Sequence, residues 1–195
     1  LTYSPTHLGI RLVNFATSND SHLRSVVAFL KQLHEAMLLN NIVIPLHMIN
    51  LDHLGYATYC LGSHTITMPV GADPYFYSRG YSGDDLPEKK GVYYRLEDMA
   101  YIREPDLWDE LAESNYRLPC YCEVCERLGT LIEVQKQYPD WNFFRRVHEV
   151  LARDIEIKQF RESKVPICRA IADRFARSAK SNYINLIPST PIITV

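Results

Sequence analysis

The stretch RLPCYCEVCERLG, residues 117–129, places three of the chain's five cysteines within six positions. Cys120, Cys122 and Cys125 form a C-x-C-x-x-C pattern. Disulfides among three thiols this close would be strained, and one thiol would always be left over. A metal ion shared by the three cysteines explains the spacing more simply.

The fourth ligand of such a site is expected from a helix that follows the cysteines. Zinc in structural sites has four ligands in a tetrahedron, and three cysteines on one turn of chain supply three of them. His148 lies 23 residues after Cys125, at the edge of the apolar stripe of a predicted helix. Its second ring nitrogen has a possible carboxylate partner in Glu149 or Asp154. We therefore predict a zinc ion bound by Cys120, Cys122, Cys125 and His148.

Other interpretations of these residues stay open. The cysteines can form a redox-active or disulfide-bonded cluster. Cys122 can be a catalytic thiol, although no histidine is local to it in the sequence. His148, taken alone, can be a partly buried helix histidine with no ligand role.

Composition describes an ordinary globular chain of 195 residues, 47% hydrophobic and 23% charged, which fits one domain with an appendage. The net charge of -2 gives no bulk attraction to nucleic acid, so such a partner would need a local basic patch.

Five cysteines, three of them clustered, favour a reducing compartment. No apolar run is long enough to span a bilayer, and no signal peptide is evident. We expect a cytoplasmic protein with no membrane partner; the first residue, Leu1, suggests a piece of a longer protein.

The first part of the chain alternates strand and helix patterns. Apolar runs at 9–16, 42–49 and 64–70 predict strands, and residues 23–40 and 52–61 between them predict helices. This order implies parallel pairing through right-handed crossovers. A complete eight-stranded barrel takes roughly 250 residues, so only part of one fits here.

The remaining chain reads as a long loop at 71–95 followed by helical segments. Short helical turns broken by Pro105 are expected in 97–111. A strong helix preceded by Pro139 and Asp140 is expected to run to about Phe160, and a last helix is expected over 166–180 before an extended tail. We predict three units: a βαβαβ barrel portion with its loop (1–95), a zinc-binding subdomain (96–162), and a C-terminal helix and tail (163–195).

The segment CYCEVC…RRVHEVLARDIEIKQF resembles the zinc subdomain of the tRNA-guanine transglycosylase family, which includes queuine, archaeosine and DNA-modifying 7-deazaguanine members. Upstream, PLHMINLDHLGYATYCLGSHTIT is similar to the family's late barrel strand, its short helix and the next strand. The two matches cover roughly residues 42–160. The resemblance implies an α/β fold, a partial (β/α)8 TIM-type barrel with an inserted zinc-binding subdomain. It also implies an enzyme that exchanges guanine in nucleic acid for a 7-deazaguanine base through a carboxylate nucleophile at a strand end.

The sequence departs from the family pattern at that nucleophile. Thr67 occupies the position of the expected aspartate, and a hydroxyl does not replace a carboxylate that is ionised at neutral pH. Asp73 could take its place only through a six-residue shift of the strand, and it reads equally as a turn residue ahead of Pro74. The family's second aspartate and guanine-recognition segment belong to early strands that this chain lacks. Catalytic and substrate-binding residues therefore stay unassigned, and enzymatic activity depends on whether a missing barrel half is supplied.

Two alternatives accompany the transglycosylase interpretation. One is a non-catalytic zinc-bearing subunit or scaffold that binds nucleic acid or a partner transglycosylase, which the threonine favours. The other is a zinc-stabilised module unrelated to base exchange. Expected partners are tRNA or DNA, and a homo- or hetero-oligomer with a transglycosylase subunit.

Basic residues mark a possible nucleic-acid surface, with the Arg and Lys residues of the last helix as further candidates. Tyr93 and Tyr94 lie near the lysine pair of the long loop and suggest base stacking. Solvated charges and packing tyrosines are the simpler explanation. His47 and Asp52 flank a strand end, where barrel ligands bind, but they fit a buried histidine and a helix cap as well. The basic candidates are Lys89, Lys90, Arg145, Arg146 and Arg153.

Overall fold

Three short strands form a parallel sheet in the computed structural model, which describes residues 6–12, 20–49, 53–68, 93–102, 104–178 and 181–188. The strands β1 (Leu8–Arg11), β2 (Leu46–Ile49) and β3 (Thr65–Ile66) are arranged in that order, with β2 in the middle. In the register, Leu8 lies opposite Leu46 and Met48 opposite Ile66. Helices α1 (Asp20–Leu39) and α2 (Leu54–Cys60) connect them. The mixed α/β class and the predicted parallel pairing are confirmed.

Strand β2 is shorter than its apolar run, 42–49, suggests. Helix α1 ends where Asn41 adopts a φ of 52° and the Ile42 amide donates to the Met37 carbonyl at 2.8 Å. The chain reaches the sheet only at Leu46, so Val43 remains 93% exposed. A hydrophobic run can therefore include residues that precede the strand, because apolar character alone does not determine where hydrogen bonding to the next strand begins.

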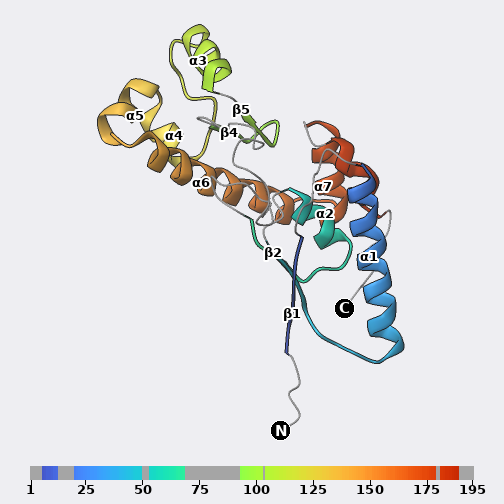
Figure 1. The fold of residues 1–195 in the computed structure, drawn as a ribbon. Coiled ribbons are helices and arrows are strands. Elements are labelled where there is room, and N and C mark those ends of the chain that lie inside the picture. The colour runs from blue at the N-terminus through green and yellow to red at the C-terminus, as the bar shows by residue number, and fades with distance from the viewer. Residues whose placement is uncertain are drawn as a thin grey trace, which may run out of the picture.

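One hydrophobic core lies between the sheet, α1, α2 and the C-terminal helix α7 (Ile167–Ala176). Leu30, Met48, Ala57 and Phe175 are 0% exposed within it. A 3-10 helix, η2 (Ser181–Leu186), adds Tyr183 and Leu186 to the same core. Figure 1 shows α7 beside α1 and α2, and η2 contacts both α1 and α2, so late and early elements of the described chain pack together.

A second group of elements follows, and the sequence patterns did not predict its hairpin. Strands β4 (Tyr93–Arg95) and β5 (Ala100–Ile102) pair antiparallel within the region expected to be loop and helical turns. Helix α3 (Glu104–Glu113) starts at Glu104 and contains Pro105 in its first turn. Proline is tolerated there, because the first amides of a helix need no intrahelical acceptor, so the expected break does not occur. Helices α4 (Glu123–Leu128) and α5 (Leu131–Gln137) complete the group.

The long helix α6 (Trp141–Arg161) links the two groups. Asp140 caps it, since its carboxylate accepts hydrogen bonds from the amides of Asn142 and Phe143. Figure 1 shows α6 running from α4 and α5 at one end to α2 and α7 at the other. Phe144 packs in the core of the cysteine-bearing group, whereas Phe160 packs in the sheet core. At a rise of 1.5 Å per residue, the helix spans roughly 30 Å. No helix among the described residues combines the length and apolar character that a membrane crossing requires.

Candidate metal centre

The three clustered cysteines lie on a tight turn closed at its base by backbone pairing. The Leu118 amide donates to the Gly129 carbonyl at 3.1 Å, and the Leu131 amide donates to the Tyr116 carbonyl at 2.9 Å. Gly129 ends α4 with a φ of 71°, a conformation that favours glycine. Cys120 precedes α4, Cys122 is its N-cap and Cys125 lies one turn further on. The turn therefore directs all three thiols to one side.

Helix α6 brings His148 to these thiols. Its Nδ1 atom lies 3.4 Å from the sulfur of Cys122 and 3.3 Å from that of Cys125. The ligand atoms of Cys120, Cys122, Cys125 and His148 all lie within 4.8 Å of one another. His148 and Cys122 are fully buried and Cys125 is 1% exposed. The structure brings together the four residues that the sequence singled out, and we call them the metal cluster.

The second nitrogen of His148 has a different partner from the one expected. Its Nε2 lies 2.6 Å from the backbone carbonyl of Tyr94, not near a carboxylate. Glu149 instead binds Tyr101 and Arg153, and Asp154 forms an ion pair with Lys158. A carbonyl only accepts hydrogen bonds, so the contact requires a proton on Nε2. That tautomer leaves the Nδ1 lone pair facing the sulfurs, which is the arrangement a metal ligand needs.

The protonation of the metal cluster is set by hydrogen bonds among its closely spaced side chains and by their burial. Hydrogen bonds from the Cys120 and Cys125 thiols lower the pKa of Cys122, so one thiolate is stabilised. Hydrogen bonds to Cys120 and Cys122, together with burial, raise the pKa of Cys125. Burial lowers the pKa of His148, but Cys120 and Cys122 outweigh it and raise that pKa to about 9. Without an ion, the Cys122 thiolate is therefore stabilised by the neighbouring thiols and by a protonated His148. A metal cation would displace the Nδ1 proton and take its place beside the thiolate.

Tyr93 completes the wall of the metal cluster. Its ring stacks on His148 with centroids 4.1 Å apart and planes 8° apart, and its hydroxyl lies 3.3 Å from the Cys125 sulfur. Burial raises the pKa of Tyr93 well above its usual value, and the cysteines add to this, so the hydroxyl keeps its proton and can donate to a thiolate. Tyr93 and Tyr94 are 0% and 1% exposed. Of the two interpretations of these tyrosines, packing in the protein core is confirmed, and stacking on nucleic acid is not supported.

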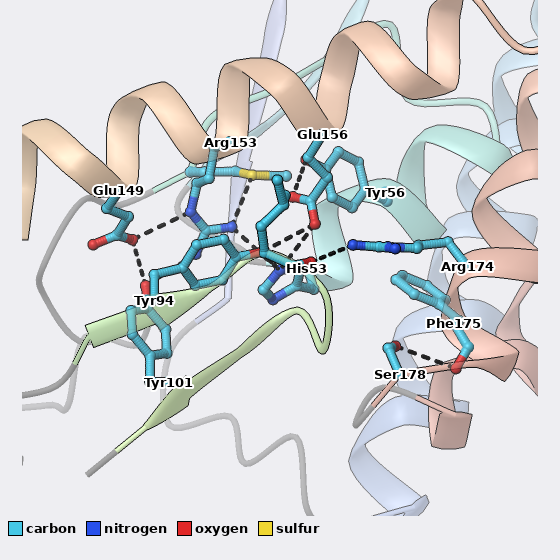
Figure 2. Close-up of polar contacts among 12 residues, drawn as sticks. His53, Tyr56, Tyr94, Tyr101, Glu149, Arg153, Glu156, Arg174, Phe175 and Ser178 are labelled. Atoms are coloured by element: carbon cyan, nitrogen blue, oxygen red, sulfur yellow. Dashed lines mark hydrogen bonds and ion pairs between the residues drawn. The ribbon is translucent and has the colours of Figure 1, made fainter. Parts of the chain in front are cut away.

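A buried group of polar side chains adjoins the metal cluster (Figure 2). The Tyr94 hydroxyl donates to one oxygen of Glu156 at 3.0 Å and lies 2.8 Å from Nε2 of His53. The Tyr56 hydroxyl donates to the other Glu156 oxygen at 2.8 Å. Both carboxylate oxygens therefore have a donor, which a buried charge needs. We call this the polar cluster: His53, Tyr56, Tyr94, Tyr101, Glu149, Arg153 and Glu156.

Arg153 belongs to the polar cluster and not to a nucleic-acid surface. It is 4% exposed, its Nε donates to Glu149 at 3.2 Å, and its Nη2 donates to the Tyr101 hydroxyl at 2.9 Å. Its guanidinium also lies over the Tyr94 ring, 4.6 Å from the centroid. A buried, paired guanidinium offers nothing to a phosphate, so its predicted surface role is corrected.

The other predicted site residues have mixed positions. Arg146 is exposed, and Arg145, which is half-buried, donates to Asn142 at 2.8 Å. Thr67 is exposed just after β3. His47 is half-buried, contacts Thr65 and lies 4.9 Å from the ring of His7. Lys89, Lys90, Asp52 and Asp73 lie outside the described residues.

The arrangement of the metal cluster points to a structural role. All four ligands come from the protein, so a tetrahedral ion bound by them has no open position for water or substrate. No protein family, curated protein or solved structure matches this chain. Its function therefore has to be argued from the residues themselves.

Proposed function

We propose that this chain is the zinc-bearing part of a transglycosylase that exchanges guanine in tRNA or DNA for a 7-deazaguanine base. The observation that carries the proposal is the gathering of Cys120, Cys122, Cys125 and His148 into one cluster. The cluster follows a parallel strand–helix–strand–helix–strand unit in the chain. That order and ligand spacing are the two features on which the resemblance to this family rests.

Zinc is the metal that suits the donor set best. Three thiolates and one imidazole are ligands that zinc prefers. A tetrahedron with Zn–S bonds near 2.3 Å and a Zn–N bond near 2.0 Å has sulfur–nitrogen edges of about 3.5 Å. The two Sγ–Nδ1 distances of 3.4 and 3.3 Å are close to that value. Little movement is needed for the ion to enter, and when bound it supplies folding energy by holding α6 against the cysteine turn.

A barrel is supported by an exposed apolar residue and by the unpaired edges of the described parallel sheet. In β2, Leu46 and Met48 are buried, whereas Ile49 is 37% exposed on the opposite face. No described strand pairs with the outer edge of β1 or β3. Parallel sheets are usually covered on both faces, so additional strands and helices are expected to complete this one.

A second candidate is a zinc-bearing subunit that has no catalytic role of its own. The specific observation is the exposed Thr67 at the end of β3, where the family resemblance calls for an aspartate. Glu149 and Glu156, the carboxylates of the adjoining polar cluster, are buried and hydrogen bonded, so neither is available as a nucleophile. In this case an active partner subunit supplies both carboxylates, and this chain contributes zinc-dependent folding and nucleic-acid contacts.

A base-exchange assay separates these possibilities. Incorporation of labelled guanine into unmodified tRNA and into DNA is measured with the purified protein alone and with each candidate partner subunit. Incorporation without a partner supports the enzyme. Incorporation only with a partner supports the non-catalytic subunit. No incorporation together with no binding of either nucleic acid overturns both.

A further inference from the structure

Two cysteines outside the metal cluster lie on helices that pack against each other, α2 and α7. Cys60 is the last residue of α2, and Cys168 is the second residue of α7. Cys60 belongs to the sheet core and Cys168 packs against it. A hydrogen bond joins the two side chains, and neither cysteine is part of a disulfide in the structure. We call Cys60 and Cys168 the thiol pair.

The two thiols differ in their access to solvent. Cys60 is 1% exposed, whereas Cys168 is partly exposed. A reagent that arrives from solution is therefore expected to react with Cys168 first. Cys60 is then the nearest thiol that can react with the modified Cys168.

The helix ends make the thiol pair asymmetric in charge. Cys168 lies in the first turn of α7, where free backbone amides and the helix dipole favour a thiolate. Cys60 lies in the last turn of α2, where the dipole disfavours one. The hydrogen bond from Cys60 lowers the pKa of Cys168 and outweighs burial, while the same bond and burial raise the pKa of Cys60. When the thiol pair loses a proton, the charge therefore forms on Cys168.

The surroundings of the thiol pair do not suggest a second metal site. Among the described residues, no histidine, carboxylate or further cysteine joins the two sulfurs to make a group of metal ligands. Helix α2 has no charged side chain. On α7, Arg169 forms an ion pair with Asp173, and Arg174 donates to the Leu96 carbonyl. The chemistry of the thiol pair is therefore that of two thiols and a helix N-terminus.

From these features we propose that the thiol pair is a site of reversible oxidation, at which a small disulfide such as oxidised glutathione links α2 to α7. In the first step the Cys168 thiolate attacks one glutathione sulfur, a mixed disulfide forms, and the other glutathione leaves as a thiolate. In the second step the Cys60 sulfur attacks the Cys168 sulfur, and its proton passes to the second glutathione, which leaves as a thiol. Two protein thiols are oxidised and one glutathione disulfide is reduced.

This inference is independent of the proposed function. In the reducing compartment that the cysteine content favours, a disulfide of this kind is transient and senses redox state. The second step is expected to be the slower one, because Cys60 gives up its proton while buried. About 100 residues separate the two cysteines, so closure constrains the unfolded chain and should raise the melting temperature.

The test exposes the reduced, zinc-loaded chain to oxidised glutathione and follows it by mass spectrometry of the intact protein and of its peptides. We expect glutathione to appear on Cys168 and then to be replaced by a disulfide between Cys168 and Cys60, with the zinc retained. Dithiothreitol should restore both thiols and return the melting temperature to its original value.

Three variants separate the steps, and their melting temperatures confirm that each is folded. Cys60→Ser keeps a hydroxyl donor but no second sulfur, so glutathione should stay on Cys168. Cys168→Ser should leave Cys60 unmodified, because that thiol is buried. Cys60→Ala removes the donor as well, so the pH midpoint for alkylation of Cys168 by iodoacetamide should be higher than in Cys60→Ser. A cysteine that only fills space at position 60 would change stability and not this midpoint.

The outcomes decide the inference. A disulfide between Cys60 and Cys168 that forms with zinc retained and is reversed by reductant supports it. Glutathione that stays on Cys168 of the wild type, or no modification of either cysteine, overturns it. Disulfides confined to Cys120, Cys122 and Cys125, with loss of zinc, overturn it in favour of redox sensitivity at the metal cluster. None of these measurements uses nucleic acid, so they stand apart from the base-exchange assay.

Discussion

The imidazole of His148 and the backbone carbonyl of Tyr94 are joined by a hydrogen bond of 2.6 Å, which ties the metal cluster to the polar cluster. The same residue, Tyr94, directs its hydroxyl to Glu156 and His53. The Tyr94 carbonyl thus orients the metal ligand His148. The Tyr94 hydroxyl lies between Glu156 of α6 and His53, which precedes α2. Tyr94 therefore contributes to the contact between the two groups of elements, in addition to α6.

The two roles of Tyr94 can be separated by Tyr94→Phe. The variant keeps the carbonyl and loses the hydroxyl, so we expect unchanged metal content and a loss of about 1–3 kcal/mol in the free energy of unfolding, because Glu156 loses a donor while staying buried. Chemical denaturation and metal analysis of the same samples measure the two quantities. Phe143→Ala, an exposed change on α6, serves as the control. Loss of metal in Tyr94→Phe would show that the hydroxyl, and not the carbonyl, positions His148.

Arg153 and Arg146 form a matched pair on α6, one buried and one exposed. Arg153→Ala leaves Glu149 buried without its cation, which is expected to cost roughly 3–5 kcal/mol of the free energy of unfolding. Arg146→Ala removes an exposed charge and is expected to change it by less than about 0.5 kcal/mol. Urea denaturation of both variants checks the contrast. Equal effects would mean that the guanidinium of Arg153 contributes no more than a surface charge.

Helices α1, α2, α6 and α7 and the metal ligands were predictable because their signals are local, whereas the short α4 and α5 were not predicted. Leu23, Val26 and Leu30 recur at helical spacing, and the described helix α1 carries all three on its buried side. The cysteine spacing likewise fixes three ligands within one turn. His148 could be chosen because a helix that follows such a turn is the nearest source of a fourth ligand.

The polar cluster and the hairpin escaped prediction for a different reason. Strands of three residues leave almost no periodicity, and the partner of His148 is a backbone carbonyl, which has no side-chain signature. One signal was present nevertheless. Glu149, Arg153 and Glu156 are spaced by four and three residues, which places opposite charges on one helix face and is compatible with a buried ion-pair network.

Metal binding and folding are expected to be coupled in this chain. We expect elemental analysis to find one zinc ion per chain, and a chelator to lower the melting temperature, because without the ion the cysteine turn and α6 lose the bonds to a shared metal that hold them together. Cys125→Ser should lose the ion and the thermal stability together. Cys168→Ser is the control, since Cys168 is a free, partly buried cysteine outside the metal cluster. A fully folded, metal-free wild-type protein would contradict the coupling.

A dependence of stability on pH is expected from His34 on α1, which is 3% exposed and whose Nε2 has no hydrogen-bond partner among the described residues. Burial lowers the pKa of His34, a hydrogen bond to the Leu61 backbone opposes this, and the nearby His64 adds to the lowering. The unfolded chain has a histidine pKa of about 6.5. Below that pH the unfolded state takes up a proton that the folded state resists, so stability falls as pH decreases.

His34→Gln removes this titration and should flatten the decline in the free energy of unfolding between about pH 7.5 and pH 5.5, a window that brackets the unfolded pKa of about 6.5. The measurement is a series of urea denaturations across that window, with the metal content determined at each pH so that loss of the ion is not mistaken for protonation of His34. A variant whose stability declines as steeply as that of wild type, at equal metal content, would place the pH sensitivity in another group. A flatter profile would identify the buried imidazole of α1 as its source.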